Sequence, residues 1–265
     1  TERDLPFIDL EKDMDLYGLL SFEDPPRKGV EETVAVAKQA GVRTIIVTGD
    51  HPLTASSIAK DVGIPSERVL TGPEIDKLSD AALRKVVKDV SVFARTTPEH
   101  KYRLVNALHK NKEVVAVTGD GVNDAIALKG ADIGIAMGVK GTDAAKEAAD
   151  AVLADDNFVT IGQGIFEGRK FFDNLRKGVR YYLSVKVALI MLFLFPVLLN
   201  IPFPFAPTQI ILLELFMDLA ASAGFVSEPA EKLIYGRPPR DPKEKFIDGH
   251  MLRGIVRSSL SLFAA

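Results

Sequence analysis

The chain has 265 residues, enough for one large domain or two of ordinary size, and a net charge of −3 gives no reason to expect nucleic acid. The absence of cysteine excludes disulfides, thiolate metal ligands and a cysteine nucleophile. Charged and apolar residues are mixed up to about residue 158, and the chain becomes strongly apolar from about residue 179. Because it starts at Thr1 and stops inside an apolar stretch, we expect a fragment of a longer protein.

In chain order, predicted strands and helices alternate over the first 136 residues. Short apolar runs predict the strands, and proline, glycine and serine signals bound the helices. Strands are expected at 16–22, 44–47, 91–94, 114–117 and 132–136, and helices at 29–40, 54–62, 79–88, 98–108 and 124–129. This alternation predicts an α/β fold with a doubly wound, mostly parallel sheet.

Polar residues follow three of these strands. They are Thr48, Gly49 and Asp50 after the second strand, Lys101 in the helix after the third, and Gly119 to Asp124 after the fourth. Open α/β sheets bind ligands at the carboxyl ends of their strands. Asp120 and Asp124 offer hard oxygen ligands for Mg²⁺, and Gly119 and Gly121 allow a tight turn with a close backbone approach.

Side chains expected at the same edge of the predicted sheet can bind a phosphoryl group. Thr48 carries a hydroxyl and Lys101 an ammonium, and phosphoryl transfer needs positioning, a cation and a metal. Each motif alone has an ordinary explanation: a Thr-Gly-Asp turn, a solvated lysine, four histidines without ligand spacing. The ordered set favours a phosphoryl-transfer site, although no aspartate in a DxxGT-type turn precedes Thr48.

These motifs resemble the phosphorylation domain of P-type cation-transporting ATPases, in the branch of the calcium, sodium–potassium and proton pumps. The matching stretches are Asp24 to Arg27, Thr48 to Pro52, Phe93 to Arg95, Lys101, Thr118 to Ala125 and Ala131 to Gly138. That family belongs to the haloacid-dehalogenase-like superfamily. One departure is Ile126, where the family usually has proline.

The resemblance implies ATP as substrate and Mg²⁺ as cofactor. It implies catalytic roles for Thr48, Lys101 and Asp120, and metal binding by Asp120 and Asp124. Phosphate or nucleotide contacts are implied for Asp24, Arg27, Thr48, Gly49, Asp50, Arg95, Lys101 and Asn123. The family's phosphorylated aspartate lies in a DKTGT motif that this chain lacks, so we expect the chain to be inactive alone.

The later residues predict a membrane hairpin. We expect the phosphorylation domain at 1–157, a linking helix at 158–180, and a transmembrane region at 181–265 with spans at 183–200 and 208–226 and a truncated third from about 252. Basic residues flank both spans and the turn between them has no charge, which places both flanks in the cytoplasm. A prokaryotic plasma membrane is expected. Two buried helices of a soluble protein are the alternative.

Three charged residues lie within these spans: Lys186, Glu214 and Asp218. Charges at membrane depth are costly and mark ion pathways, although they also form structural pairs. By resemblance, Asp218 matches an aspartate of the calcium and sodium–potassium pumps. Lys186 stands among aliphatic residues where those pumps carry asparagine and carboxylates. A built-in ammonium favours a proton as the transported cation.

Three functions are compatible with these patterns. The first is part of an ATP-driven cation pump, whose remaining N-terminal part would then be a partner in the same protein. The second is a membrane-anchored phosphohydrolase of the same fold. The third is a non-catalytic partner of an intact pump.

Overall fold

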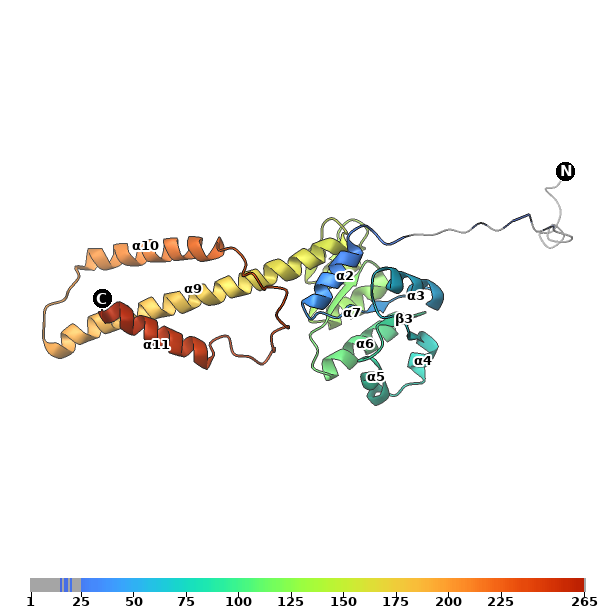
Figure 1. Cartoon of the computed structure of the whole chain (residues 1–265), viewed down its shortest axis with the longest axis horizontal. Coiled ribbons are helices and arrows are strands. Elements are labelled where there is room, and N and C mark those ends of the chain that lie inside the picture. Colours follow the sequence, from blue (N-terminus) through green and yellow to red (C-terminus); the bar gives the residue numbers. More distant parts are fainter. Residues whose placement is uncertain (1–14, 16, 19, 21–24, 265) are drawn as a thin grey trace.

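The computed structural model describes residues 15, 17, 18, 20 and 25–264 (Figure 1). These residues form an α/β part, from which the long helix α9 extends with helices α10 and α11 alongside it. Of the strand expected at 16–22, only residues 17, 18 and 20 are described, and none of them belongs to a strand; Asp24 lies outside the described residues.

The described strands form two three-stranded sheets, and every strand pair is parallel. The first sheet has the order β1-β3-β2, and the second has the order β4-β5-β6. The strands are β1 Ile46–Val47, β2 Val69–Thr71, β3 Val92–Ala94, β4 Ala116–Gly119, β5 Ile133–Met137 and β6 Ala151–Leu153. The expected α/β fold with parallel strands is confirmed, with β2 and β6 as strands that the apolar pattern did not predict.

Helices precede and connect the strands. They are α2 Val30–Gln39, α3 Pro52–Asp61, α4 Gly72–Asp76, α5 Asp80–Val86, α6 Pro98–Lys110, the 3₁₀ turn η1 Val122–Asp124, α7 Ala125–Gly130 and α8 Asp143–Ala148. Ser79 caps α5 as expected, since its hydroxyl accepts from the amide of Ala82 at 3.3 Å. The sequence patterns did not indicate α4 and α8, which have five and six residues.

The central strand β3 divides the core of the first sheet. Its side chains alternate between the two faces, as a strand requires. Phe93 packs with residues of α4, α5 and α6, including Ile75, Leu83 and Leu104. Val92 and Ala94 pack with residues of α2 and α3 on the other face. Helices on both faces of a parallel sheet make a doubly wound arrangement.

Helix α9 runs from Phe158 to Leu199 without a break, so it crosses the boundary at residue 180 that the sequence led us to expect. Asn157 caps it by accepting from the amide of Val159 at 3.1 Å, and Pro196 lies inside its last turns. Helices α10 (Pro207–Val226) and α11 (Gly249–Ala264) follow. Within the described residues, α9 and α10 are long and apolar enough to cross a membrane.

Helix α2 packs against the first turns of α9 and joins it to the α/β part. A Cβ on Gly162 would lie 2.8 Å from the Thr33 methyl group, so the two helices approach closely there. Farther along, the Arg169 guanidinium donates to the Ala40 carbonyl at 2.5 Å. These contacts fix α9 relative to α2, which packs on one face of the first sheet.

Candidate active site

Lys101 and Asp124 form an ion pair between helix α6 and the turn after β4. The Lys101 ammonium donates to Asp124 Oδ1 at 2.6 Å. The other oxygen, Oδ2, accepts from the amides of Asp120 and Gly121, each at 3.2 Å. Both oxygens of this buried carboxylate therefore have partners, and charge-assisted hydrogen bonds of this kind are strong.

The turn after β4 needs a glycine at position 119. A Cβ on Gly119 would lie 2.4 Å from the Cβ of Asp124, which leaves no room for a side chain. Gly121 differs: its φ is −100°, and a Cβ there would have its nearest contact at 3.7 Å. The expected close approach is thus present at Gly119 and absent at Gly121.

The turn at 48–50 is bonded to the end of β3. The Thr48 carbonyl accepts from the amide and the hydroxyl of Thr96, at 3.0 and 2.9 Å. The Thr48 hydroxyl accepts from the Asp50 amide at 3.1 Å, and the Asp50 carbonyl accepts from the Arg95 amide at 3.0 Å. Arg95 has a left-handed φ of 49°. Sequence reasoning missed Thr96, which is buried and lies five residues before Lys101.

The side-chain oxygens of Asp120, Asn123 and Asp124 are of the kind that binds Mg²⁺. The described residues nevertheless contain no group of three or more histidine, cysteine, aspartate or glutamate side chains that could hold a metal. Asp124 is engaged by three donors, whereas the side chains of Asp120 and Asn123 are exposed. Of the two aspartates, Asp120 is therefore the one with a solvent-exposed carboxylate, called the open carboxylate below. Its own carbonyl accepts from the Thr142 amide at 2.9 Å, which fixes its backbone.

Arg27 precedes α2, and its guanidinium donates to the Asp156 carbonyl, two residues before α9, at 2.6 Å. The Asp156 carboxylate accepts from the amides of Val139 and Lys140, at 3.0 and 2.7 Å. These bonds, the Val139 amide foremost, hold the pKa of Asp156 below its usual value of 3.8. Arg27 thus joins the segment before α2 to the point where the α/β part meets α9.

The apolar helices bring together two of the three charged residues predicted there. The Lys186 ammonium on α9 lies 2.7 Å from Glu214 Oε1 on α10 and 5.1 Å from the centre of the Tyr182 ring. Asp218 lies one turn after Glu214 and is exposed. Within the described residues, Lys186 thus forms its ion pair with Glu214 rather than with Asp218.

Comparisons with known proteins assign both parts of the chain. A family model described as haloacid dehalogenase-like hydrolase matches residues 2–132, a second with that description matches 101–165, and the model "Cation transporting ATPase, C-terminus" matches 202–265. A calcium-transporting ATPase of Bacillus subtilis is 45% identical over 88% of this chain and 26% of its own length. The chain belongs to the P-type cation-transporting ATPases.

Two further curated relatives agree with this assignment. Calcium-transporting ATPase 1 of Lactococcus lactis is 42% identical over 96% of this chain and 29% of its own length. The human sodium/potassium-transporting ATPase subunit alpha-4 is 41% identical over 94% of this chain and 27% of its own length. A solved catalytic domain of the CPx-ATPase CopB-B, 27% identical, has a TM-score of 0.40 over 52% of this chain and 44% of that one. The chain spans about a quarter of the length of these P-type relatives.

Proposed function

We propose that this chain supplies the metal- and phosphate-handling half of the catalytic site of an ATP-driven cation pump, together with part of its ion pathway. The observation that carries the proposal is the Lys101–Asp124 pair at 2.6 Å, held by the amides of Asp120 and Gly121 at the end of β4. A fixed cation beside an open carboxylate is the arrangement that stabilises a transferring phosphoryl group and its metal.

The proposed roles follow from these contacts. Asp120 binds Mg²⁺ directly, and Asp124 supports the site by orienting Lys101 and the turn. Lys101 faces the phosphoryl charge, and the Thr48 turn, held by Thr96, presents its hydroxyl and the Gly49 amide to the same group. The remaining nucleotide or phosphate contacts rest on the family resemblance: Arg27, Asp50, Arg95, Asn123 and Asp24, the last outside the described residues.

The phosphorylated aspartate lies outside these 265 residues in our proposal, because the sequence has no DKTGT motif. Another part of the same pump then supplies it. The chain alone completes no catalytic cycle: it offers the charges that stabilise a phosphoryl group, and no carboxylate to accept that group.

The metal site is tested on the chain itself with Mn²⁺ as a spectroscopic substitute for Mg²⁺. We expect weak binding, and Asp120→Asn should weaken it roughly tenfold or more because it removes the open carboxylate. Asp89→Asn is the matched control, since Asp89 is an exposed aspartate before the amino end of β3, away from the carboxyl ends of the strands.

The same preparation given radiolabelled ATP should take up no covalent phosphate. Equal Mn²⁺ affinity in both variants, or a labelled chain, would refute the proposal.

In the membrane, we propose that α9 and α10 cross a prokaryotic plasma membrane within a multi-pass protein, with the α/β part in the cytoplasm. No residue of α10 is buried in the structure, which suits a helix surrounded by lipid or by other helices. The match of residues 202–265 to a cation-transporting ATPase model supports a pump over a membrane-anchored phosphohydrolase. The same match also favours a chain that is part of a transporting pump over a chain that is only a non-catalytic partner of one.

For the ion, we propose a proton. The printed names of the relatives favour calcium, or sodium and potassium. In this chain, however, the Lys186 ammonium already lies 2.7 Å from Glu214, where it takes the place of a bound cation beside that carboxylate. Asp218, exposed and one turn away, is left as the proton carrier.

Transport by the longer pump, reconstituted in vesicles, tests this choice. Lys186→Met should shift the pH profile of transport and make activity depend on an added metal cation, because it leaves the Glu214 carboxylate without its built-in partner. Tyr182→Phe keeps the ring beside Lys186 and should retain the original profile. A Lys186→Met pump with an unchanged pH profile and cation dependence would contradict the proton proposal.

A further inference from the structure

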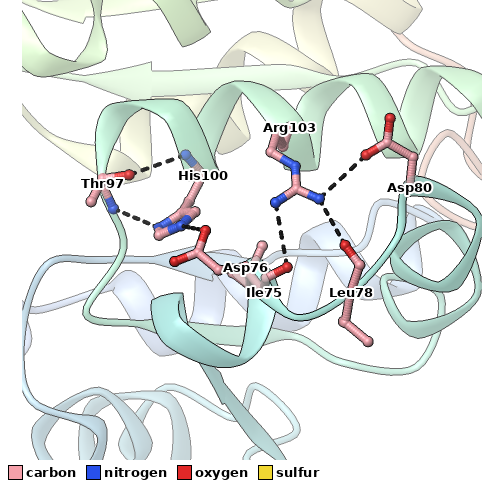
Figure 2. Close-up of polar contacts among 7 residues, drawn as sticks. All are labelled: Ile75, Asp76, Leu78, Asp80, Thr97, His100 and Arg103. Carbon is pink, nitrogen blue, oxygen red and sulfur yellow. Dashed lines mark hydrogen bonds and ion pairs between the residues drawn. The ribbon is translucent and has the colours of Figure 1, made fainter.

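His100 is buried between the start of α6 and the end of α4 (Figure 2). Its Nδ1 accepts from the Thr97 amide at 3.0 Å, and its own amide donates to the Thr97 hydroxyl at 3.4 Å. This reciprocal pair is a capping box with histidine in the place usually taken by glutamate or glutamine. Because Nδ1 accepts, the ring proton lies on Nε2, which donates to Asp76 Oδ1 at 2.8 Å.

Space around the ring is restricted as well. A Cβ on Gly72, the first residue of α4, would lie 2.8 Å from His100 Cε1 and 2.3 Å from the Arg95 carbonyl. The imidazole is therefore held by Thr97 on one side, Asp76 on another and the backbone of Gly72 on a third.

Arg103 repeats the connection one turn later in α6 (Figure 2). Its guanidinium donates to the carbonyls of Ile75 and Leu78, at 3.3 and 3.0 Å, and to Asp80 Oδ1 at 3.3 Å. Residues three apart lie on the same face of a helix. That face of α6 is thus bonded to the segment from α4 to the start of α5.

Lys101 follows His100 and lies about 100° farther around the helix. It points to Asp124, on the second sheet's side of α6. The first turn of α6 therefore has one face fixed to α4 and another face that presents the ammonium.

We propose that His100 is a positioning residue for Lys101: it fixes the first turn of α6 so that the ammonium reaches Asp124 and the phosphoryl group. The role of Lys101 at that group rests on the proposed function, but the positioning itself does not. Without His100, the first turn loses the bond to the Thr97 amide and the bond to Asp76 together. Lys101 then moves with a frayed helix end.

The test measures the reactivity of the Lys101 amine in the 265-residue chain. Each variant is treated briefly with acetic anhydride, and acetylation of Lys101 is quantified by mass spectrometry relative to Lys60 of α3. His100→Ala should make Lys101 react about fivefold faster, the factor that corresponds to loss of a typical helix cap. His100→Gln should restore the slow rate, because an amide can both accept from Thr97 and donate to Asp76.

Asn111→Ala is the matched control at the other end of α6, where the Asn111 side chain donates to the Arg84 carbonyl at 2.7 Å. It should lower the melting temperature and leave Lys101 acetylation unchanged. Three results would overturn the proposal: wild-type reactivity in His100→Ala, no recovery in His100→Gln, or equal acceleration in Asn111→Ala. Acetylation requires no metal, nucleotide or phosphorylation, so the proposed function and this inference can fail separately.

Discussion

At the residue scale, Asp124 contributes to the site mainly by organising other groups. A buried carboxylate without partners is strongly unfavourable. Asp124 offsets that cost with the Lys101 ammonium and the amides of Asp120 and Gly121. Each of these donors is thereby fixed in direction. The carboxylate orders the lysine, the backbone turn and the position of Asp120 at once.

Asp156 orders a second turn in the same way and makes part of the stability depend on pH. Amides of Val139 and Lys140 favour its ionised form and lower its pKa from the usual 3.8. A lowered carboxyl pKa stabilises the fold above the unfolded-state value, and this contribution is lost as pH falls through the folded-state pKa. We therefore expect acid to weaken the wild-type chain below about pH 4.

Asp156→Asn should remove that part of the pH dependence. The variant should be less stable than wild type at neutral pH, and the difference should shrink as the pH falls below about 4. Thermal unfolding followed by circular dichroism at a series of pH values measures it. A difference between the two proteins that stays constant down to pH 2 would show that the Asp156 charge has no such role.

At the element scale, one of the close approaches between α2 and α9 is at a glycine of α9. Helical glycine normally destabilises a helix relative to alanine by about 1 kcal/mol. Gly162 is different because a Cβ there would lie 2.8 Å from the Thr33 methyl group. Gly164, two residues on in the same helix, would meet nothing within 4 Å.

Substitution of these two glycines by alanine should therefore change the free energy of unfolding in opposite directions. Gly164→Ala should stabilise the chain by up to about 1 kcal/mol, because only the helix propensity changes. Gly162→Ala should destabilise it, because α2 must move away from α9 to make room. Unfolding in denaturant compares the two variants directly. If both were equally stabilising, α2 would not be packed on α9 as described.

The sequence predicted well the elements that a clear start or stop signal bounds, such as the proline that opens α6 after β3. The buried strand at 91–94 and the helix beginning at Pro98 lie within a few residues of β3 and α6. β2, β6, α4 and α8 span three to six residues, too few for periodicity to distinguish them from turns. The continuity of α9 was missed because its composition changes near residue 180 while its backbone does not.

The candidate site was predictable in position more than in detail. The pattern of polar residues after strands selected Thr48, Lys101, Asp120 and Asp124. The structure brings Lys101 and Asp124 together, whereas Thr48 follows β1 of the first sheet and Asp120 follows β4 of the second. Which oxygen of Asp124 meets Lys101 depends on how α6 and the turn after β4 pack, and sequence spacing does not contain that information. The spacing of the four histidines predicts no ligand role for them, and the Thr97–His100 capping box shows the bonds that one of them makes.

At the scale of the whole molecule, the two charged pairs lie in different parts of an elongated structure (Figure 1). Lys101 and Asp124 belong to the α/β part, and Lys186 and Glu214 belong to the apolar helices. α9 passes from one part to the other. It is tied to the α/β part by α2 and by the guanidinium of Arg169.

Because α9 is one uninterrupted helix, a small rotation at its base produces a large displacement at its far end. With a rise of 1.5 Å per residue, Lys186 lies about 42 Å along the axis from Phe158. A tilt of about 5° at the base would displace that ammonium sideways by about 4 Å, more than the length of its ion pair with Glu214. With α10 held in place, a small change in how α2 seats the base of α9 is therefore sufficient to separate Lys186 from Glu214.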